Sequence, residues 1–268
     1  MKANVGLFWA GSALLFSLAH VAPVLSADTP AEQVKAREIE VQADAMQKDY
    51  KAERRQMTLT LINSQGQQSV RKVTYESLEG ADRQDKTLLS FVYPPDMKGV
   101  SLLTYEHTVG DDDQWLYLPS LQRVKRIASS NKSGSFMGSE FAYEDLVVRQ
   151  LEKFDYRYLR EEVVDGKRCH VIERLPRDKN SGYSKIVRWR LADNLQELKS
   201  EYYDRKGELL KFRVMEGHHQ VAGIWRVKSI SVTNVQTNKK SVLSFDEIAI
   251  KIDIPADKFR VQSLESRG

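Results

Sequence analysis

Apolar and polar residues alternate over most of the chain, beginning with Met57, Leu59 and Leu61 among threonines. Similar short runs recur as far as Ile250 and are separated by turn signals such as Asp165-Gly166, which favours a two-residue hairpin. About eleven strands follow one another with no helical pattern between them. The pattern predicts a mainly β protein built on one meandering antiparallel sheet, either open or curled toward a barrel.

Several of these segments carry charged residues on one face and apolar residues on the other. Ser184 to Arg190 is an example, and we expect its charged face to meet water. Ile224 to Val235 is interpreted as one further strand of the same kind. A sheet of this length must curl, and its concave face then needs side chains, a helix or a ligand to fill it.

One helix is predicted ahead of the strands. Thr29-Pro30-Ala31-Glu32 is typical of a helix start, with Thr as the N-cap, Pro at the first position and an acid in the first turn. The apolar stripe that follows consists of Val34, Ile39, Val41 and Met46. We expect an amphipathic helix from Thr29 to about Tyr50, packed over or beside the concave face.

The first 27 residues have the pattern of a signal peptide. Lys2 is followed by an apolar stretch from Val5 to Val21 and by small residues at Pro23 to Ala27. We expect cleavage after Ala27, with Ser26 as the alternative. A transmembrane anchor is disfavoured by the short apolar region and by Pro23. Residues 28–268 are therefore expected to be an exported single domain that is not embedded in a membrane.

Composition excludes several classes of function. The 268 residues are 41% hydrophobic and 29% charged, with a net charge of +4. No basic stripe with interleaved aromatics is present, so nucleic acid is not an expected partner. Cys169 is the only cysteine, which rules out an intramolecular disulfide and a lipid-anchored N-terminus. We expect Cys169 to be a buried small hydrophobe.

Three polar clusters were considered as sites of chemistry. Asp111-Asp112-Asp113 lacks the spacing of a calcium loop and fits a solvated acidic turn. His218-His219 has no third ligand nearby and fits a turn after Gly217. Glu144-Asp145 fits a helix start or an element that orders a loop, because no nucleophile or cofactor loop accompanies it. We therefore expect no catalytic residue, no metal and no cofactor, and a protein that is not an enzyme.

The segment from Gln114 to Leu146 is the least ordinary part of the chain. A loop of small polar residues holds Phe136 and Met137 between Gly134 and Gly138. One interpretation is a mobile flap whose apolar pair contacts a ligand or a partner. The other is that the pair anchors the loop in the core.

The same segment carries a family resemblance. The run WLYLPSLQRVKRI…GSFMGSEFAYEDL, preceded by Asp112-Asp113-Gln114, resembles the signature of the outer-membrane lipoprotein-sorting protein family of Gram-negative bacteria. Members of this family are similar to the periplasmic lipoprotein carrier LolA. Further matching pieces are Pro94 to Gly99, Asp165-Gly166 with Cys169 to Glu173, Ser181 to Lys185, Tyr202 to Leu210 and Asn234 to Thr237.

The resemblance implies an open, strongly curved half-barrel, with the N-terminal helix and short helices covering its concave face and a hydrophobic cavity for acyl chains. It further implies a periplasmic, non-enzymatic carrier of lipoproteins or other lipids, acting beside an inner-membrane transporter of the RND or MMPL class. The alternative is an accessory or sensor protein that binds a protein partner and carries no lipid.

Two groups of residues are the expected contacts. The predicted lipid-binding residues are Trp115, Tyr117, Phe136, Met137, Phe141 and Tyr143. The residues predicted to meet a lipid head group or a partner are Arg123, Lys125 and Arg126, for which a solvated strand face is the alternative.

Overall fold

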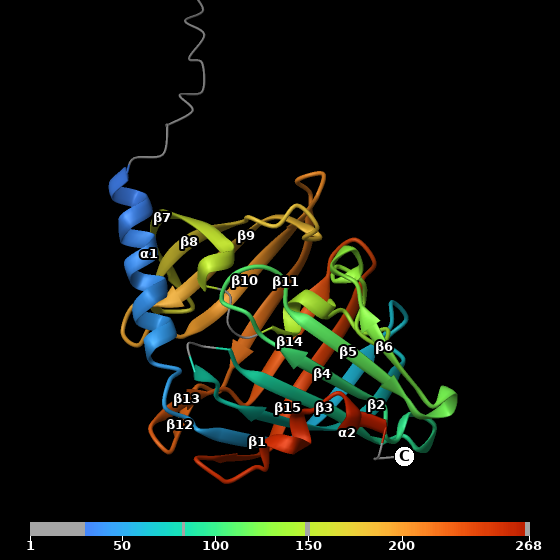
Figure 1. The fold of residues 1–268 in the computed structure, drawn as a ribbon. Coiled ribbons are helices and arrows are strands. Elements are labelled where there is room, and N and C mark those ends of the chain that lie inside the picture. Colours follow the sequence, from blue (N-terminus) through green and yellow to red (C-terminus); the bar gives the residue numbers. More distant parts are fainter. Residues whose placement is uncertain (1–29, 82–83, 148–150, 266–268) are drawn as a thin grey trace, which may run out of the picture.

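The computed structural model describes residues 30–81, 84–147 and 151–265. The predicted signal peptide, its cleavage site and Thr29 lie outside these residues. Within them, the chain forms one open antiparallel sheet and a single long helix, α1 (Pro30–Ala45) (Figure 1). The prediction of a mainly β fold with one helix at its N-terminal end is confirmed.

The sheet has thirteen strands, more than the eleven expected. They are β1 (Ala52–Ile62), β2 (Gln68–Leu78), β3 (Lys86–Tyr93), β4 (Ser101–Tyr105), β5 (Asp113–Leu118), β6 (Arg123–Ile127), β7 (Phe154–Val164), β8 (Lys167–Pro176), β9 (Tyr183–Leu191), β10 (Glu197–Asp204), β11 (Leu209–Glu216), β14 (Ser229–Asn234) and β15 (Lys239–Ile250). A separate hairpin consists of β12 (His219–Val221) and β13 (Ile224–Arg226).

The single strand predicted for Ile224 to Val235 is divided between β13 and β14. The chain leaves the sheet at Gly217, whose φ is 69°, and returns at Lys228. A Cβ on Gly217 would lie 2.7 Å from the side chain of Lys228, so only glycine lets the two passing segments approach this closely. Alternation alone did not reveal this excursion.

The strand order places two strands that are consecutive in the sequence, β6 and β7, at opposite edges of the sheet. The order is β6-β5-β4-β3-β2-β1-β15-β14-β11-β10-β9-β8-β7, so β6 and β7 are the two edges. The chain between them, whose described residues 128–147 and 151–153 we call the crossing segment, must therefore pass over one face of the sheet. This segment contains most of the loop that stood out in the sequence.

The inner face of the sheet, defined here as the face that α1 and the crossing segment cover, is filled in two different ways. Beneath α1, the helix residues Ala36, Ile39 and Ala43 pack with Tyr156, Tyr158, Ile172 and Tyr183. Beneath the crossing segment, Phe136 and Phe141 pack with residues of β1 to β5, among them Met57, Val73, Phe91 and Leu102.

The predicted apolar stripe of α1 was wrong except at Ile39. Val34 and Val41 are 56% and 42% exposed, and Met46 follows the end of the helix. The buried positions are Ala36, Ile39, Glu40 and Ala43, which have the i, i+3, i+4, i+7 spacing of one helical face. Two alanines, Ile39 and a buried carboxylate occupy the packed face, whereas Val34 and Val41 remain outside.

The outer face has its own cover. The C-terminal short helices η7 (Ala256–Phe259) and α2 (Gln262–Glu265) bring Phe259 and Leu264 against Leu88, Leu103 and Tyr117. The expectation that short helices cover the same face as the N-terminal helix was therefore wrong for η7 and α2. It holds for η5 (Tyr143–Leu146), which belongs to the crossing segment on the inner face. Cys169 is fully buried on the outer face beside Val187 and Trp189, as predicted.

Candidate functional site

The tip of the crossing segment is folded into the core. The amide of Phe136 donates to the carbonyl of Phe141 at 2.7 Å, and that of Tyr143 donates to Gly134 at 3.1 Å. Phe136 is 3% exposed, and its ring lies 5.8 Å from that of Phe91. The structure thus places Phe136 as a core anchor, the second of the two interpretations. Contact of these side chains with lipid stays a prediction.

The structure does not bring the six predicted lipid-binding residues together. Phe136 and Phe141 are buried on the inner face, and Met137 and Tyr143 lie half-buried beside them. Trp115 and Tyr117 point to the outer face, where Tyr117 is buried under the C-terminal helices and Trp115 packs edge-on against Tyr105.

The predicted head-group residues lie on the edge strand β6. Arg123, Lys125 and Arg126 are all exposed, and the guanidinium of Arg126 pairs with the carboxylate of Asp113. Their placement agrees with a solvated strand face and leaves them accessible to a partner. No cavity described below includes them.

Glu144 and Asp145 fasten the crossing segment to the opposite half of the sheet. Glu144 accepts hydrogen bonds from the amide of Gly182 and the hydroxyl of Ser181, both at 2.8 Å. Asp145 accepts from Tyr183 at 2.8 Å and from the ammonium of Lys211 at 2.6 Å. The prediction that this acidic pair orders the loop is confirmed.

Glycine is required where the crossing segment meets β9. A Cβ on Gly182 would lie 2.7 Å from the Cβ of Ser133 and 3.0 Å from Oε1 of Glu144. Burial raises the pKa of Glu144 despite the hydrogen bonds that it accepts from Gly182 and Ser181. The crossing segment therefore packs directly against the start of β9 at Gly182.

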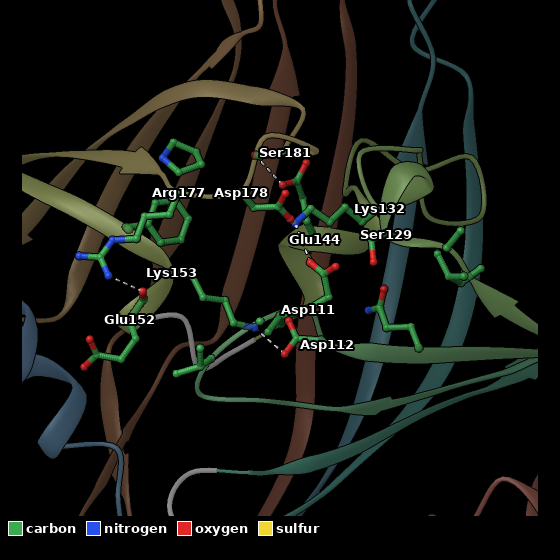
Figure 2. A pocket seen from close by; sticks show the side chains of 18 residues that line it. Asp111, Asp112, Ser129, Lys132, Glu144, Glu152, Lys153, Arg177, Asp178 and Ser181 are labelled. Atoms are coloured by element: carbon green, nitrogen blue, oxygen red, sulfur yellow. Dashed lines mark hydrogen bonds and ion pairs between the residues drawn. The ribbon is translucent and has the colours of Figure 1, made fainter.

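A first cavity of about 380 Å³ opens between the crossing segment, residues 109–112 and the ends of β7 and β8. Its apolar wall consists of Val109, Ile127, Val147, Phe154 and Pro176. Ion pairs line its polar side, as Figure 2 shows: Lys132 points toward Asp178, and Lys153 lies 2.5 Å from Asp112. Two carboxylates of the acidic turn are thus paired with basic side chains, Asp112 with Lys153 and Asp113 with Arg126.

A second cavity of about 320 Å³ lies deeper, beneath α1. Residues from α1, β1, β7 to β11, β13, β14 and the crossing segment line it. The two cavities share Glu144, Val147 and Phe154, so they adjoin. The charged cluster at the centre of the second cavity consists of Glu40, Arg174, Arg188, Arg190, Glu197 and Arg213. We call this set the arginine cluster.

Two buried carboxylates organise three of the four arginines. Glu40 accepts from Arg190 at 2.7 and 2.9 Å and from Arg188 at 3.1 Å. Glu197 accepts hydrogen bonds from Nη2 of Arg213 at 2.7 Å and from its Nε at 3.0 Å. The Nε of Arg188 lies 2.9 Å from Glu197 without hydrogen-bond alignment.

These contacts set the protonation of the cluster. Burial opposes ionisation of Glu40, but Arg190 and Arg188 outweigh it and lower the pKa of Glu40 to about 2. The pKa of Glu197 is lowered in the same way, with burial outweighed by Arg188 and Arg213. Burial, reinforced by repulsion from Arg174, lowers the pKa of Arg188 to about 10. Glu40, Glu197 and Arg188 are therefore ionised at neutral pH.

Arg174 is the exception within the cluster. The residue is 4% exposed, and its guanidinium carbon lies 3.9 Å from the ring centre of Phe154. Among the described residues, no carboxylate forms an ion pair with it, and its Nε has no hydrogen-bond partner. Arg174 is thus a buried cation that no carboxylate contacts directly, although it interacts electrostatically with Glu40.

The expectation that the charged face of Ser184 to Arg190 meets water was wrong. Arg188 is 8% exposed and points inward, because Glu40 of α1 and Glu197 of β10 supply its counter-charges. The sequence analysis missed all six residues of the arginine cluster. The one available signal was Glu40, which shares the helical spacing of Ala36, Ile39 and Ala43.

Over the residues that the structure describes, no three His, Cys, Asp or Glu side chains are grouped to hold a metal ion. Of the helices in the described ranges, none is sufficiently long and apolar to span a bilayer.

Comparisons with known proteins give a consistent family. A family model described only as an uncharacterized protein matches residues 83–266. A solved domain from Vibrio parahaemolyticus, described as outer membrane lipoprotein-sorting, is 40% identical, with a TM-score of 0.85 over 87% of this chain and 99% of that one. No curated protein matches the chain.

Two further solved structures are similar. A DUF1329 family protein from Desulfovibrio piger is 27% identical, with a TM-score of 0.83, and covers 87% of this chain and 99% of its own. A LolA superfamily protein from Nitrosomonas europaea is 19% identical, with a TM-score of 0.70, and covers 85% and 98%; this likeness concerns the fold alone.

Proposed function

The chain belongs to the outer-membrane lipoprotein-sorting protein family, and from this premise we propose that it is a periplasmic carrier of lipoprotein acyl chains or of another lipid. The likeness to a LolA superfamily fold supports a binding role for the inner face of the sheet. The carrier would receive its cargo beside an inner-membrane transporter of the RND or MMPL class.

The observation that carries this proposal is the pair of adjoining cavities. Their volumes lie at the lower end of the range for small-molecule sites. Val147 and Phe154 line both cavities and are the apolar residues that the two share. An acyl chain lying in the first cavity would cover apolar surface that is open to solvent there, such as the exposed side chain of Val109.

We propose binding without catalysis. The acidic pair nearest the cavities, Glu144 and Asp145, is engaged in holding the crossing segment to β9 and β11. A carboxylate whose oxygens accept structural hydrogen bonds is poorly placed to act as a general base. The exposed basic residues of β6 offer a separate contact for a transporter or a membrane surface.

Native mass spectrometry of the protein purified from its own envelope without detergent tests the proposal. We expect a bound lipid that is lost on denaturation. Val147→Trp should fill the wall shared by the two cavities and remove the lipid, whereas Val163→Trp, on a position 65% exposed, should retain it. Lipid-free protein with a stoichiometric protein partner would instead support the accessory role.

A further inference from the structure

We propose that the arginine cluster binds a phosphate group, so that the ligand of this protein is an amphiphile with a phosphate head in the second cavity and an apolar tail in the first. The assignment of the tail rests on the proposed lipid-binding function. The assignment of the phosphate rests on the charges, burial and contacts of the cluster itself.

The first argument is charge balance. Four arginines face two glutamates in the cluster, so these six residues carry a net charge of +2. Among the other acids that line the cavity, Asp145 is paired with Lys211, and Glu144 accepts hydrogen bonds from Gly182 and Ser181. Asp44 lies half-buried at the end of α1. A phosphate ester carries one or two negative charges and matches this excess.

The second argument is the state of Arg174. A buried charge is costly unless it is paired, and its Nε has no partner among the described residues. Guanidinium groups present parallel N–H donors that match phosphate oxygens bidentately. A fold that retains such a group at the wall of a cavity gains from it when a ligand supplies the missing anion.

The third argument is that Arg174, in the second cavity, lies beside a residue that both cavities share. Its guanidinium stacks on Phe154, and Phe154 lines both cavities. An anion bound by Arg174 therefore lies beside the apolar wall that leads into the first cavity. This arrangement fits a ligand that is charged at one end and apolar along the rest.

Calorimetric titration with three probes tests the inference. Dodecyl phosphate and dodecyl maltoside share a tail and differ in head-group charge, and inorganic phosphate has no tail. We expect the wild-type protein to bind dodecyl phosphate at least tenfold more tightly than dodecyl maltoside. Arg174→Met should abolish this preference, and Arg168→Met, an exposed position on the same strand, should leave it unchanged.

Stability separates the proposed role from a structural one. Replacing an unpaired buried charge by an apolar side chain of similar volume is often neutral or stabilising, so Arg174→Met should melt at or above the wild-type temperature. Arg174→Lys keeps the charge without the bidentate geometry and should retain part of the preference. This second variant also serves if the methionine variant does not fold.

Each outcome has one consequence. Equal affinity of the wild-type protein for both amphiphiles, or an unchanged preference in Arg174→Met, would overturn the phosphate site and leave lipid binding intact. Binding of neither amphiphile would overturn the proposed function as well as this inference. Inorganic phosphate bound as tightly as dodecyl phosphate would support the anion site and overturn the amphiphile as its source.

Discussion

The two halves of the inner face are built on the same sheet and differ in what fills them. In the half formed by β1 to β5, Phe136 and Phe141 of the crossing segment complete a packed apolar core. In the half formed by β7 to β11, α1 covers tyrosines and the arginine cluster, and a cavity remains. The first half is therefore a structural core, and the second is the place where the fold leaves room for a ligand.

This difference also explains how the crossing segment serves both halves. Its tip is an apolar anchor in the packed half, and its base carries Glu144 and Asp145, which hydrogen-bond to residues of the charged half. The segment forms the boundary between a region stabilised by apolar packing and a region stabilised by paired charges.

The largest expected effect is in the packed half. Phe136→Ala should lower the free energy of unfolding by about 3–5 kcal/mol, because it leaves a cavity at a fully buried aromatic. Met137→Ala is the matched control and should cost less than about 1 kcal/mol, because the side chain is half-exposed. Urea denaturation measures both. Equal effects of the two substitutions would mean that Phe136 is not an anchor.

The charged half should be recognised by its pH dependence. The pKa of Glu40 falls from 4.5 to about 2 on folding, so its stabilisation is present above pH 4.5 and is lost as the pH falls toward 2. The loss from Glu40 alone is about 3 kcal/mol, and Glu197 adds to it in the same direction. Thermal unfolding between pH 6 and pH 2 measures this change. A melting temperature that is constant over this range would contradict the ionised cluster.

The junction between the halves should show an intermediate effect. Asp145→Asn removes the charge that Lys211 meets and weakens the hydrogen bond from Tyr183, at a cost of about 2 kcal/mol. Asp155→Asn, which affects an exposed pair with Arg177, should cost less than about 1 kcal/mol. Hydrogen exchange should further show that Asp145→Asn loosens the amides of the crossing segment selectively.

The smallest stability effect is expected at the exposed edge. Replacing Arg123, Lys125 and Arg126 together by serine should change the free energy of unfolding by less than about 1 kcal/mol, because only an exposed ion pair is lost. If these residues meet a membrane or a transporter, lipid transfer to anionic vesicles should slow at low salt. Unchanged transfer at all salt concentrations would leave them as a solvated strand face.

Much of the fold was predictable because it depends on local pattern. Alternation and turn residues such as Asp165-Gly166 predicted most strands, and the hairpin between β7 and β8 forms there. The strand count was too low, and Ile224 to Val235 was wrongly joined, because Gly217 permits a close approach to Lys228 that only the folded chain reveals. Periodicity describes single strands and contains no information on such passing segments.

The candidate site was less predictable for a physical reason. A strand such as Ser184 to Arg190 has the same alternation whether its arginines meet water or buried glutamates. The decision depends on Glu40, which lies on a helix far away in the sequence and is brought to Arg188 and Arg190 only by tertiary packing. In the same way, the sequence around Arg174 does not indicate that Glu40 and Glu197 are paired with other arginines in the folded protein.

The order of strands has a consequence for the way the molecule assembles. Strands β1 to β6 form one meander of local hairpins, and β7 to β15 contain a second, whereas β1 and β15 meet only when Glu53 lies opposite Ile250. Contacts between distant residues form slowly, because a long loop must close before they are made. We therefore expect each meander to form early in folding and the β1–β15 pairing to form late. While β15 is still missing, β1 pairs only with β2 and leaves its other side as an open edge of the sheet.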